Sequence, residues 1–497
     1  MSGFEDEIEA KPGTLAPPIS RRNLIRAGAV AGVAAVAAVE LPASASTGSD
    51  STGPITPPLF TSALPIPAEA RPTLRTPWYD YYEFTMREAP VQIVPGLSTT
   101  AYTFNGQFPG PTIRARQGRP VVVRQRNRLS VPTATHLHGG HNAQIDDGYP
   151  LDTVAPGQDR VYTYRNLKPA APLWYHDHAM GYEAESAYRG LAGQYLVTDD
   201  YEDQLPLPGG QYEVPLIFRD AAIAADGTLL YDASNPGGSD RTTMLVNGRA
   251  TPYFGVAARK YRFRMSNYAN ERAFILQLSD SSEVTLIGSD GGFLPTAQTV
   301  NTISMAPSER ADVIIDFSRY PVGTQLVLHN TKNFPGETGE IMRFDVVRTA
   351  EDTSQVPQTF QAAPDFGPPV RERTFTLSFD PQMKMFLING KMFDPKRIDA
   401  TATLGTTEVW SIVNADNGKI RIPHTFHTHL EQFRVLDRNG LPPAPSETGL
   451  KDTVSVAPGD TVRFAVRFTD YTGLFPFHCH MMEHSNNMMM GQVNVVA

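Results

Sequence analysis

Length, composition and charge narrow the possible classes of protein. The chain has 497 residues, enough for about three domains of ordinary size, and its 41% hydrophobic and 19% charged residues exclude broad disorder. A net charge of -9 gives no general attraction for nucleic acid, and 39 Gly with 42 Pro favour short strands and turns over long helices, so we predict an all-β protein.

The first 45 residues have the layout of an export signal. Arg21-Arg22 precede an apolar run from Ala27 to Val39, and Ala43-Ser44-Ala45 offers the small residues that a signal peptidase accepts. The arginine pair resembles the twin-arginine signal, which implies delivery by the twin-arginine export machinery; the alternative is a chance pair in an ordinary secretory signal. The apolar run is too short to span a bilayer. We therefore expect an exported protein, periplasmic, cell-surface or secreted, with no membrane association after cleavage.

Two sequence markers recur at equal intervals along the rest of the chain. Asn-Gly occurs at 105–106, 247–248 and 389–390, and Ala-Pro followed by Gly or Ser occurs at 155–157, 306–308 and 457–459. Alternating apolar residues follow the second marker, most clearly at Val462, Phe464, Val466 and Phe468, and predict half-buried strands. Three β-rich repeats of sandwich or barrel type are therefore predicted.

Composition places the boundaries of these repeats at stretches rich in Pro, Ser and Thr. The predicted divisions are the signal at 1–45, a linker at 46–69, domain one at 70–205, domain two at 206–350, a second linker at 351–369 and domain three at 370–497.

Ten of the 12 histidines gather in four short clusters. The clusters are His136 and His138; His176 and His178; His424, His427 and His429; and His478, His480 and His484. Residues i and i+2 of a strand point to one face, so a His-X-His pair suits metal binding, although a single pair is more often a surface or packing feature. Four clusters at matching places in repeats one and three, with the only cysteine, Cys479, inside one of them, predict a metal centre between domains one and three.

Repeat two serves as an internal control for this reading. Ala273-Phe274-Ile275-Leu276 stands where repeat one has its first cluster, and His329 alone corresponds to the second. We therefore expect no metal site in domain two and a structural, hydrogen-bonded role for His329. His141, just after the first cluster, is expected to lie beside the metal centre or at the surface rather than to bind metal.

The donor atoms favour copper. A thiolate with two imidazoles and a weak axial thioether is typical of a blue-copper electron-transfer centre, and Cys479, His424, His484 and Met489 can supply this set. The other eight clustered histidines form an imidazole-only set suited to copper or zinc, and a neighbouring redox metal favours copper. His478-Cys479-His480 would connect the two sites covalently, so that an electron accepted at Cys479 reaches the histidine cluster through one residue.

The motifs HLHG, HDH, HTFHTH and HCHMMEHSNNMM together resemble those of the multicopper oxidases, over essentially the whole mature chain. The segments DDGYP, LWYHDHAM and APSERADVIIDF are most similar to the bacterial spore-coat laccase and bilirubin oxidase branch. This resemblance implies three consecutive cupredoxin-like Greek-key β-sandwich or barrel domains. It also implies an enzyme that passes four single electrons from a small donor to O₂, yielding two waters.

The resemblance further implies four coppers per chain, with ligands carried over motif by motif. Type 1 copper takes His424, Cys479 and His484 with Met489 axial, and type 2 copper takes His136 and His427. The type 3 pair takes His138, His176 and His480 on one ion and His178, His429 and His478 on the other.

The acidic residues near the ligands follow the family only in part. Asp147 matches the family's acidic residue near type 2 copper, which implies proton relay or tuning; the alternative is a turn residue in Asp146-Asp147-Gly148. Ser485 follows His484 where the branch commonly has Glu, so proton delivery is expected to differ. We do not expect Glu483 to substitute, because it alternates to the other side of a local strand. Thr425 and Thr428 replace the usual Pro and Leu without changing the ligand spacing.

The donor is expected to be organic. Cuprous-oxidising relatives carry a methionine-rich insertion in domain three, whereas residues 351–372 contain no Met. A phenol, aromatic amine or bilin-like donor is therefore preferred, although Met383, Met385 and Met392 could form a small soft-metal patch. The alternatives are a cuprous oxidase in copper tolerance, a two-step nitrite reductase, and a non-enzymatic exported copper-binding or scaffold protein. The last two are disfavoured because all four motifs and all ten histidines are present in one chain.

Overall fold

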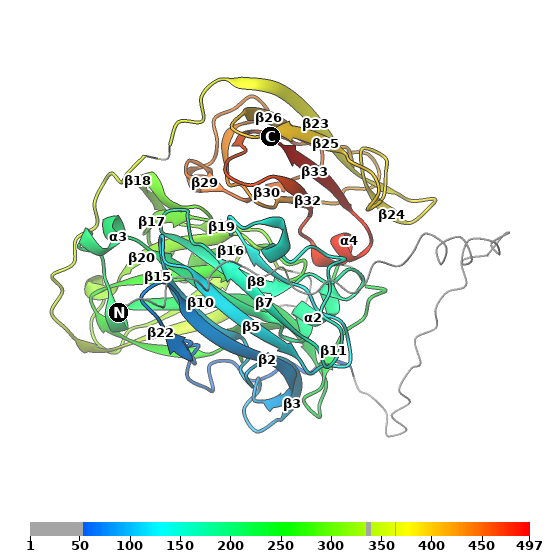
Figure 1. Ribbon diagram of the computed structural model, residues 1–497. Helices are drawn as coiled ribbons and strands as arrows, with labels where there is room; N and C mark the ends of the chain where they lie inside the picture. Colours follow the sequence, from blue (N-terminus) through cyan, green and yellow to red (C-terminus); the bar gives the residue numbers. More distant parts are fainter. Residues whose placement is uncertain (1–52, 236, 334–338, 363) are drawn as a thin grey trace, which may run out of the picture. The chain divides into compact units, whose positions relative to one another are not determined.

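The computed structural model describes residues 53–235, 237–333, 339–362 and 364–497 (Figure 1). Strands dominate this part of the chain, and its α-helices are short: α2 (Glu183–Arg189), α3 (Asp200–Gln204) and α4 (Met482–Asn486). The predicted all-β class is confirmed. Within the same residues no helix has the length and apolar character needed to cross a membrane. The predicted export signal lies outside the described residues.

The strands of residues 74–198 form two sheets. One has the order β1 (Leu74–Arg75), β2 (Asp80–Val91), β5 (Val121–Asn127) and β7 (Asp159–Tyr164), with β3 (Thr99–Phe104) paired to β2. The other has the order β4 (Gly110–Arg116), β9 (Ala192–Thr198), β8 (Ala171–Asp177) and β6 (Thr135–His138). Alternate side chains of both sheets, such as Phe84 of β2 and Tyr175 of β8, share one buried core.

The strands of residues 213–349 form a second pair of sheets around their own core. The larger sheet has the order β13 (Arg249–Ala250), β12 (Thr243–Val246), β10 (Glu213–Ile223), β15 (Lys260–Asn267), β20 (Arg310–Asp316), β17 (Val284–Ser289) and β18 (Gly292–Val300), with β11 (Leu229–Leu230) on β10. The smaller has the order β14 (Tyr253–Ala258), β22 (Glu340–Thr349), β21 (Gln325–Asn330), β16 (Phe274–Leu278) and β19 (Ile303–Met305).

The strands of residues 369–496 form a third pair. One sheet has the order β24 (Met385–Ile388), β23 (Pro369–Asp380), β26 (Thr407–Asn414), β31 (Thr461–Arg467), β28 (Phe433–Arg438) and β29 (Leu450–Lys451). The other has the order β25 (Ala400–Thr403), β33 (Met490–Val496), β32 (Gly473–Cys479), β27 (His424–Thr428) and β30 (Thr453–Val456). The alternation predicted after the third Ala-Pro marker is present, because Val462, Phe464, Val466 and Phe468 are all buried in the core of this pair.

Strand pairing repeats along the chain as the markers do. The parallel pairs β2–β5, β10–β15 and β23–β26 correspond to one another, and so do β4–β9, β14–β22 and β25–β33. Each sheet therefore draws its strands from one of the three segments in which the markers recur. The domain limits given above stay predictions.

The Asn-Gly marker has one structural task in all three segments. Asn105, Asn247 and Asn389 have φ near +50°, and the glycine after each also has a positive φ, as a tight hairpin turn requires. Each asparagine side chain accepts a backbone N–H from the long strand beside it, from Thr85, Ile217 and Thr376 respectively. The marker thus closes a hairpin and fastens it to the neighbouring strand.

Candidate metal centre

Two pairs of neighbouring strands carry the histidine clusters. In the first segment His136 of β6 lies opposite His176 of β8, and in the last segment His427 of β27 lies opposite His478 of β32. Because residues two apart share one face of a strand, His136 and His138 are presented together, whereas His424, three residues before His427 on β27, is not presented with it. His484 follows on α4, in the turn of chain directly after β32.

The structure brings all ten clustered histidines and Cys479 into four buried sets whose ligand atoms lie within 4.8 Å of one another. The sets are His136, His138 and His427; His138, His176 and His480; His178, His429 and His478; and His424, Cys479 and His484. Residues from both ends of the chain meet in three of them, as the sequence analysis predicted. His141 is buried but lies outside the sets, with its ring nitrogens 3.1 Å from the Leu430 carbonyl and from Asp470 Oδ2.

The set around Cys479 has the geometry of a three-coordinate site. The sulfur lies 3.6 Å from Nδ1 of His424 and 3.5 Å from Nδ1 of His484. The outer nitrogen of His424 lies 3.0 Å from Asp416 Oδ2, and the ring of Phe386 stacks on His484 at 3.7 Å. Burial raises the pKa of the Cys479 thiol to about 12, so a bound cation is needed to hold the thiolate at neutral pH.

Met489 is placed beside this set. It is fully buried in the same core as Cys479, and its carbonyl oxygen accepts the Cys479 backbone N–H at 3.1 Å. Met488 is half-buried and has a left-handed φ of 71°, while Met490 begins β33. Which of the three sulfurs is the axial ligand stays a prediction in favour of Met489.

The inward-facing nitrogens of the imidazole sets converge without protein partners that could satisfy them. The Nε2 atoms of His178, His429 and His478 lie 3.2 to 3.3 Å from one another. Among the described residues, no hydrogen-bond partner lies against the buried Nε2 atoms of His136, His176 and His427. Buried polar atoms are rarely left unpaired, and converging imidazole nitrogens suit a copper or zinc ion. The residues therefore fit the metal sites that the sequence predicts.

Each outward-facing nitrogen of the same rings lies against an oxygen atom of the protein. Backbone carbonyl oxygens lie against Nδ1 of His136, His176, His427 and His478, at 2.6, 2.9, 2.8 and 3.1 Å. Side-chain oxygens lie against the outer nitrogens of the other four: Asp147 Oδ2 at 2.7 Å from His429, Ser308 Oγ at 2.6 Å from His480, Asp452 Oδ1 at 3.0 Å from His138, and Glu183 Oε2 at 3.3 Å from His178. Carbonyl and carboxylate oxygens only accept, so the outer nitrogens facing them carry the proton and the inner nitrogens are free to bind metal.

Burial keeps most of these rings neutral. It lowers the pKa of His136, His138, His427, His429 and His480 well below the usual value, with neighbouring histidines adding to the effect. The pKa of His176 falls to about 3 and that of His478 to about 4 for the same reason. His178 is the exception: burial is the largest single influence and lowers its pKa, but the nearby Glu183 and Asp177 carboxylates together help to raise the pKa above its usual value. Neutral imidazole is the form that binds metal.

Asp147 lies where the sequence placed it. Its side chain is fully buried; Oδ2 contacts His429, Oδ1 lies 3.6 Å from Nδ1 of His136, and its own carbonyl accepts from that same nitrogen. One residue thus contacts ligands of two different sets. Burial raises the pKa of the Asp147 carboxyl well above its usual range.

The middle segment contributes residues that the sequence analysis did not assign. Arg310 of β20 donates to both oxygens of Asp452, and Ser308, with φ of 74°, stands in the turn that precedes this strand. Both belong to the APSERADVIIDF segment, which marked the resemblance but carried no role. The middle segment, which has no metal set of its own among the described residues, therefore contacts two of the imidazoles, His480 directly and His138 through Asp452.

One expectation about Glu483 is corrected. The segment after His480 is the helix α4 and not a strand, so strand alternation is the wrong reason for setting Glu483 aside. Glu483 instead accepts from Arg241 Nη2 at 2.6 Å and from Asn270 Nδ2 at 2.9 Å, both from the middle segment. Its carboxylate is held by these two partners.

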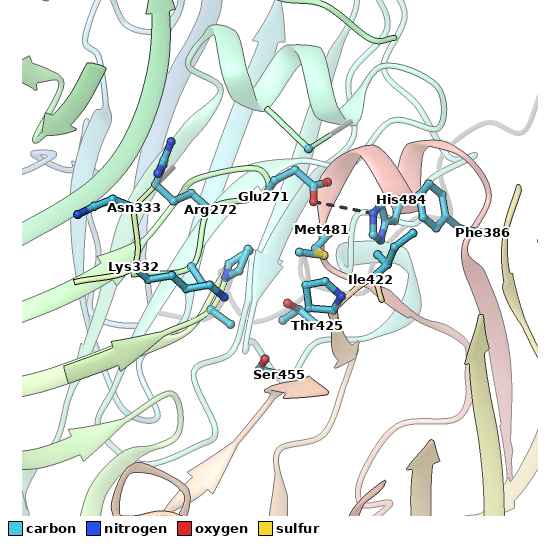
Figure 2. A pocket seen from close by; sticks show the side chains of 15 residues that line it. Glu271, Arg272, Lys332, Asn333, Phe386, Ile422, Thr425, Ser455, Met481 and His484 are labelled. Atoms are coloured by element: carbon cyan, nitrogen blue, oxygen red, sulfur yellow. Dashed lines mark ion pairs between the residues drawn. The ribbon is translucent and has the colours of Figure 1, made fainter. Parts of the chain in front are cut away.

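A cavity of about 450 Å³ lies against the set around Cys479 (Figure 2). Its lining is largely apolar, with Phe386, Ile422 and Met481, and it includes the ring of His484. Figure 2 shows the Glu271 carboxylate pointing toward His484, with Oε2 3.9 Å from Nε2. The Oε1 atom of Glu271 is buried and has no hydrogen-bond partner in the part of the chain that the structure describes.

Several known proteins are similar to this chain in sequence or structure. Protein-family models described as Multicopper oxidase match residues 85–202 and 364–497. The chain is 35% identical to a laccase of Bacillus subtilis (strain 168) over 88% of this chain and 98% of that one, and 34% identical to a bilirubin oxidase of Albifimbria verrucaria over 88% and 81%. A crystal structure of laccase from Pediococcus acidilactici Pa5930 matches with a TM-score of 0.83 at 30% identity, covering 89% of this chain and 95% of that one.

Proposed function

The chain belongs to the multicopper oxidase family, and from this premise we propose that it oxidises small aromatic donors and passes four electrons to O₂. Family membership carries with it an all-β, cupredoxin-like fold, oxidoreductase chemistry and a requirement for copper. The number of coppers, their ligands and the donor are our proposals. The convergence of ten histidines and one cysteine in four buried sets, with inner nitrogens unpaired, is the observation that supports them most directly.

We assign four copper ions to the four sets. His424, Cys479 and His484, with Met489 axial, hold type 1 copper; His136 and His427 hold type 2; the other two sets hold the type 3 pair. Copper bound there supplies one-electron transfer at type 1 and O₂ reduction at the trinuclear cluster. The metal set of Asp147, His136 and His429 overlaps these sites, so Asp147 is assigned to tuning them.

The chain supplies a short path for electrons between the cavity and the trinuclear cluster. The ring of His484 lines the cavity, and its other nitrogen faces the Cys479 sulfur. Cys479 is bonded on either side to His478 and His480, which belong to the two type 3 sets. An electron from a donor that contacts His484 therefore passes to the Cys479 sulfur and then along the backbone to His478 or His480 at the O₂ site.

An aromatic donor fits the cavity by size and by lining. About 450 Å³ accommodates a small ring compound, and the apolar side chains suit its faces. Glu271 lines the cavity, and its Oε2 atom beside His484 is placed to hydrogen-bond with a phenol O–H or an aromatic amine N–H. We therefore propose phenols, aromatic amines or bilin-like compounds as the donor class.

Oxygen uptake by copper-loaded protein tests the function. Four donors are compared: a phenol, an aromatic amine, bilirubin and Cu(I). Uptake with the organic donors, and its loss in Cys479→Ser, is expected. Glu271→Gln is expected to raise KM for the phenol more than it changes kcat. No uptake with any donor by protein that has bound copper would leave the scaffold alternative standing.

A cuprous oxidase is the alternative that the same assay decides. Met383 and Met392 are exposed and, like Met385, do not line the cavity; Met481 is the thioether that does. One thioether is a poor basis for a soft-metal site. Faster uptake with Cu(I) than with every organic donor would reassign the substrate.

Export through the twin-arginine machinery stays a prediction from residues 1–45.

A further inference from the structure

Glu183 begins helix α2, five residues after His178, and is buried. Its Oε2 atom lies 3.3 Å from Nδ1 of His178 and accepts a hydrogen bond from the Ser485 hydroxyl at 3.1 Å. Ser485 comes from α4, and the two short helices pack against each other. A carboxylate from one end of the chain thus reaches a proposed copper ligand and is held by a hydroxyl from the other end.

This carboxylate decides which nitrogen of His178 faces the cluster. The contact is an ion pair without hydrogen-bond geometry, because Nδ1 of His178 has no hydrogen-bond partner among the described residues. A carboxylate 3.3 Å away favours a proton on Nδ1, which leaves Nε2, 3.2 Å from Nε2 of both His429 and His478, with its lone pair for metal. For His136, His176, His427 and His478 a backbone carbonyl performs this task. The orientation of His178 therefore depends on a side chain.

Stability alone is a weak reason for a buried acid at this position. The second carboxylate oxygen, Oε1, is buried and has no hydrogen-bond partner among the described residues. Burying a carboxylate costs free energy unless both oxygens are paired. A functional need for a carboxylate beside His178 explains the buried Glu183 better than fold stability does.

The residue at position 485 bears on the role of the Glu183 carboxylate. The oxidases that this chain resembles commonly carry Glu directly after the last histidine of the motif, and this chain has Ser485. Here the small hydroxyl points at a carboxylate that enters from α2. We propose that Glu183 is a positioning residue of the trinuclear site: it fixes the tautomer and orientation of His178, and Ser485 holds it in place. This rests on the proposed function of the His178, His429 and His478 set.

Exchange of the two residues tests the proposal. Glu183→Ser removes the carboxylate, and the double variant Glu183→Ser with Ser485→Glu returns one to the same contact from α4 at nearly constant volume. Glu183→Gln keeps the size and removes the charge. Glu185→Gln is the matched control, because Glu185 lies on the same helix but is exposed and pairs with Arg189.

Copper content after dialysis against a chelating competitor and the spectroscopic signature of the type 3 pair are the readouts. Glu183→Ser is expected to weaken copper retention at the trinuclear site about 10- to 100-fold, with a smaller loss for Glu183→Gln and none for Glu185→Gln. The exchange variant is expected to recover most of the loss. The blue type 1 absorption should stay, and ¹⁵N-histidine spectra of copper-free Glu183→Ser should show a changed tautomer for one ring.

The outcomes distinguish the role proposed for Glu183 from the proposed function of the enzyme. Unchanged copper retention and type 3 signature in both single variants, with wild-type loading complete, would overturn the role of Glu183. Loss in Glu183→Ser without recovery in the exchange variant, at unchanged histidine tautomers, would make the effect structural and overturn it as well. Failure of wild-type protein to load the trinuclear site would instead contradict the proposed function.

Discussion

Asp147→Ala perturbs the proposed trinuclear site through the outer, non-ligating nitrogen of one of its histidines. It removes the Oδ2 contact with His429 at 2.7 Å, while the Asp147 backbone carbonyl, which accepts from His136, remains. One of two ligand contacts is therefore lost and the other kept. Asp147 touches none of His424, Cys479 and His484, so the type 1 site should be left intact.

The size of the effect follows from the lost hydrogen bond. Loss of an orienting partner behind a metal ligand typically costs about 10- to 100-fold in metal affinity or activity. We therefore expect O₂ reduction to slow by about 10- to 100-fold, with donor oxidation at type 1 nearly unchanged. Asp147→Asn, which keeps an accepting oxygen, should lose less.

Single-turnover measurements separate the two half-reactions. Anaerobic reduction by a phenol reports donor oxidation, and reoxidation of fully reduced protein reports O₂ reduction. Asp146→Ala is the matched control: its carboxylate accepts the Thr163 backbone N–H at 2.9 Å and belongs to none of the metal sets. Equal slowing of both half-reactions in Asp147→Ala would refute the reasoning and return Asp147 to a turn role.

Three further predictions follow from other contacts. Met489→Leu should raise the type 1 reduction potential and keep the blue colour, because a weak donor to Cu(II) is removed; potentiometric titration should show little shift for Met488→Leu, and a larger one would reassign the ligand. Arg310→Met should lower the free energy of unfolding by about 3–5 kcal/mol in denaturant titration, because Asp452 is left buried without its counterion; a change below about 1 kcal/mol would contradict this. Copper-free protein should lose stability as the pH falls from about 6.5 to about 4, because His478 is protonated in the unfolded chain over this range but stays neutral in the folded chain, where its pKa is about 4. A denaturation midpoint that does not change over this pH range would contradict the prediction.

Local sequence patterns predicted the fold class and the clustering of the histidines because both depend on short-range spacing. The assignment of ligands to individual coppers came from the family resemblance and stays a proposal. Strand alternation put Val462, Phe464 and Val466 in one core, and His-X-His spacing put His136 and His138 on one face of β6. The repeated Asn-Gly pair marked hairpins because two successive residues with positive φ are required there.

The partners behind the ligands were not predictable in the same way. Ser308 contacts His480, and Arg310 contacts Asp452 behind His138, between segments far apart in sequence. Glu183 is only five residues from His178, but a lone Ser, Arg or Glu has no spacing that marks it as the partner of a ligand. Ser485 was noticed as a departure, but its compensating carboxylate lies 302 residues away. Glu483 was set aside for the wrong reason, because five residues are too short a window to distinguish the helix α4 from a strand.

Metal analysis with visible absorption spectroscopy on fully loaded protein, with Cys479→Ser beside it, is the most direct test of the copper assignment. Four coppers per chain and a blue band are expected, since the four sets offer one type 1 site and three imidazole sites. Cys479→Ser should lose the blue band, one copper and donor oxidation while it keeps its fold by circular dichroism. Zinc in the loaded protein, fewer than three coppers, or retained turnover in Cys479→Ser would contradict the assignment.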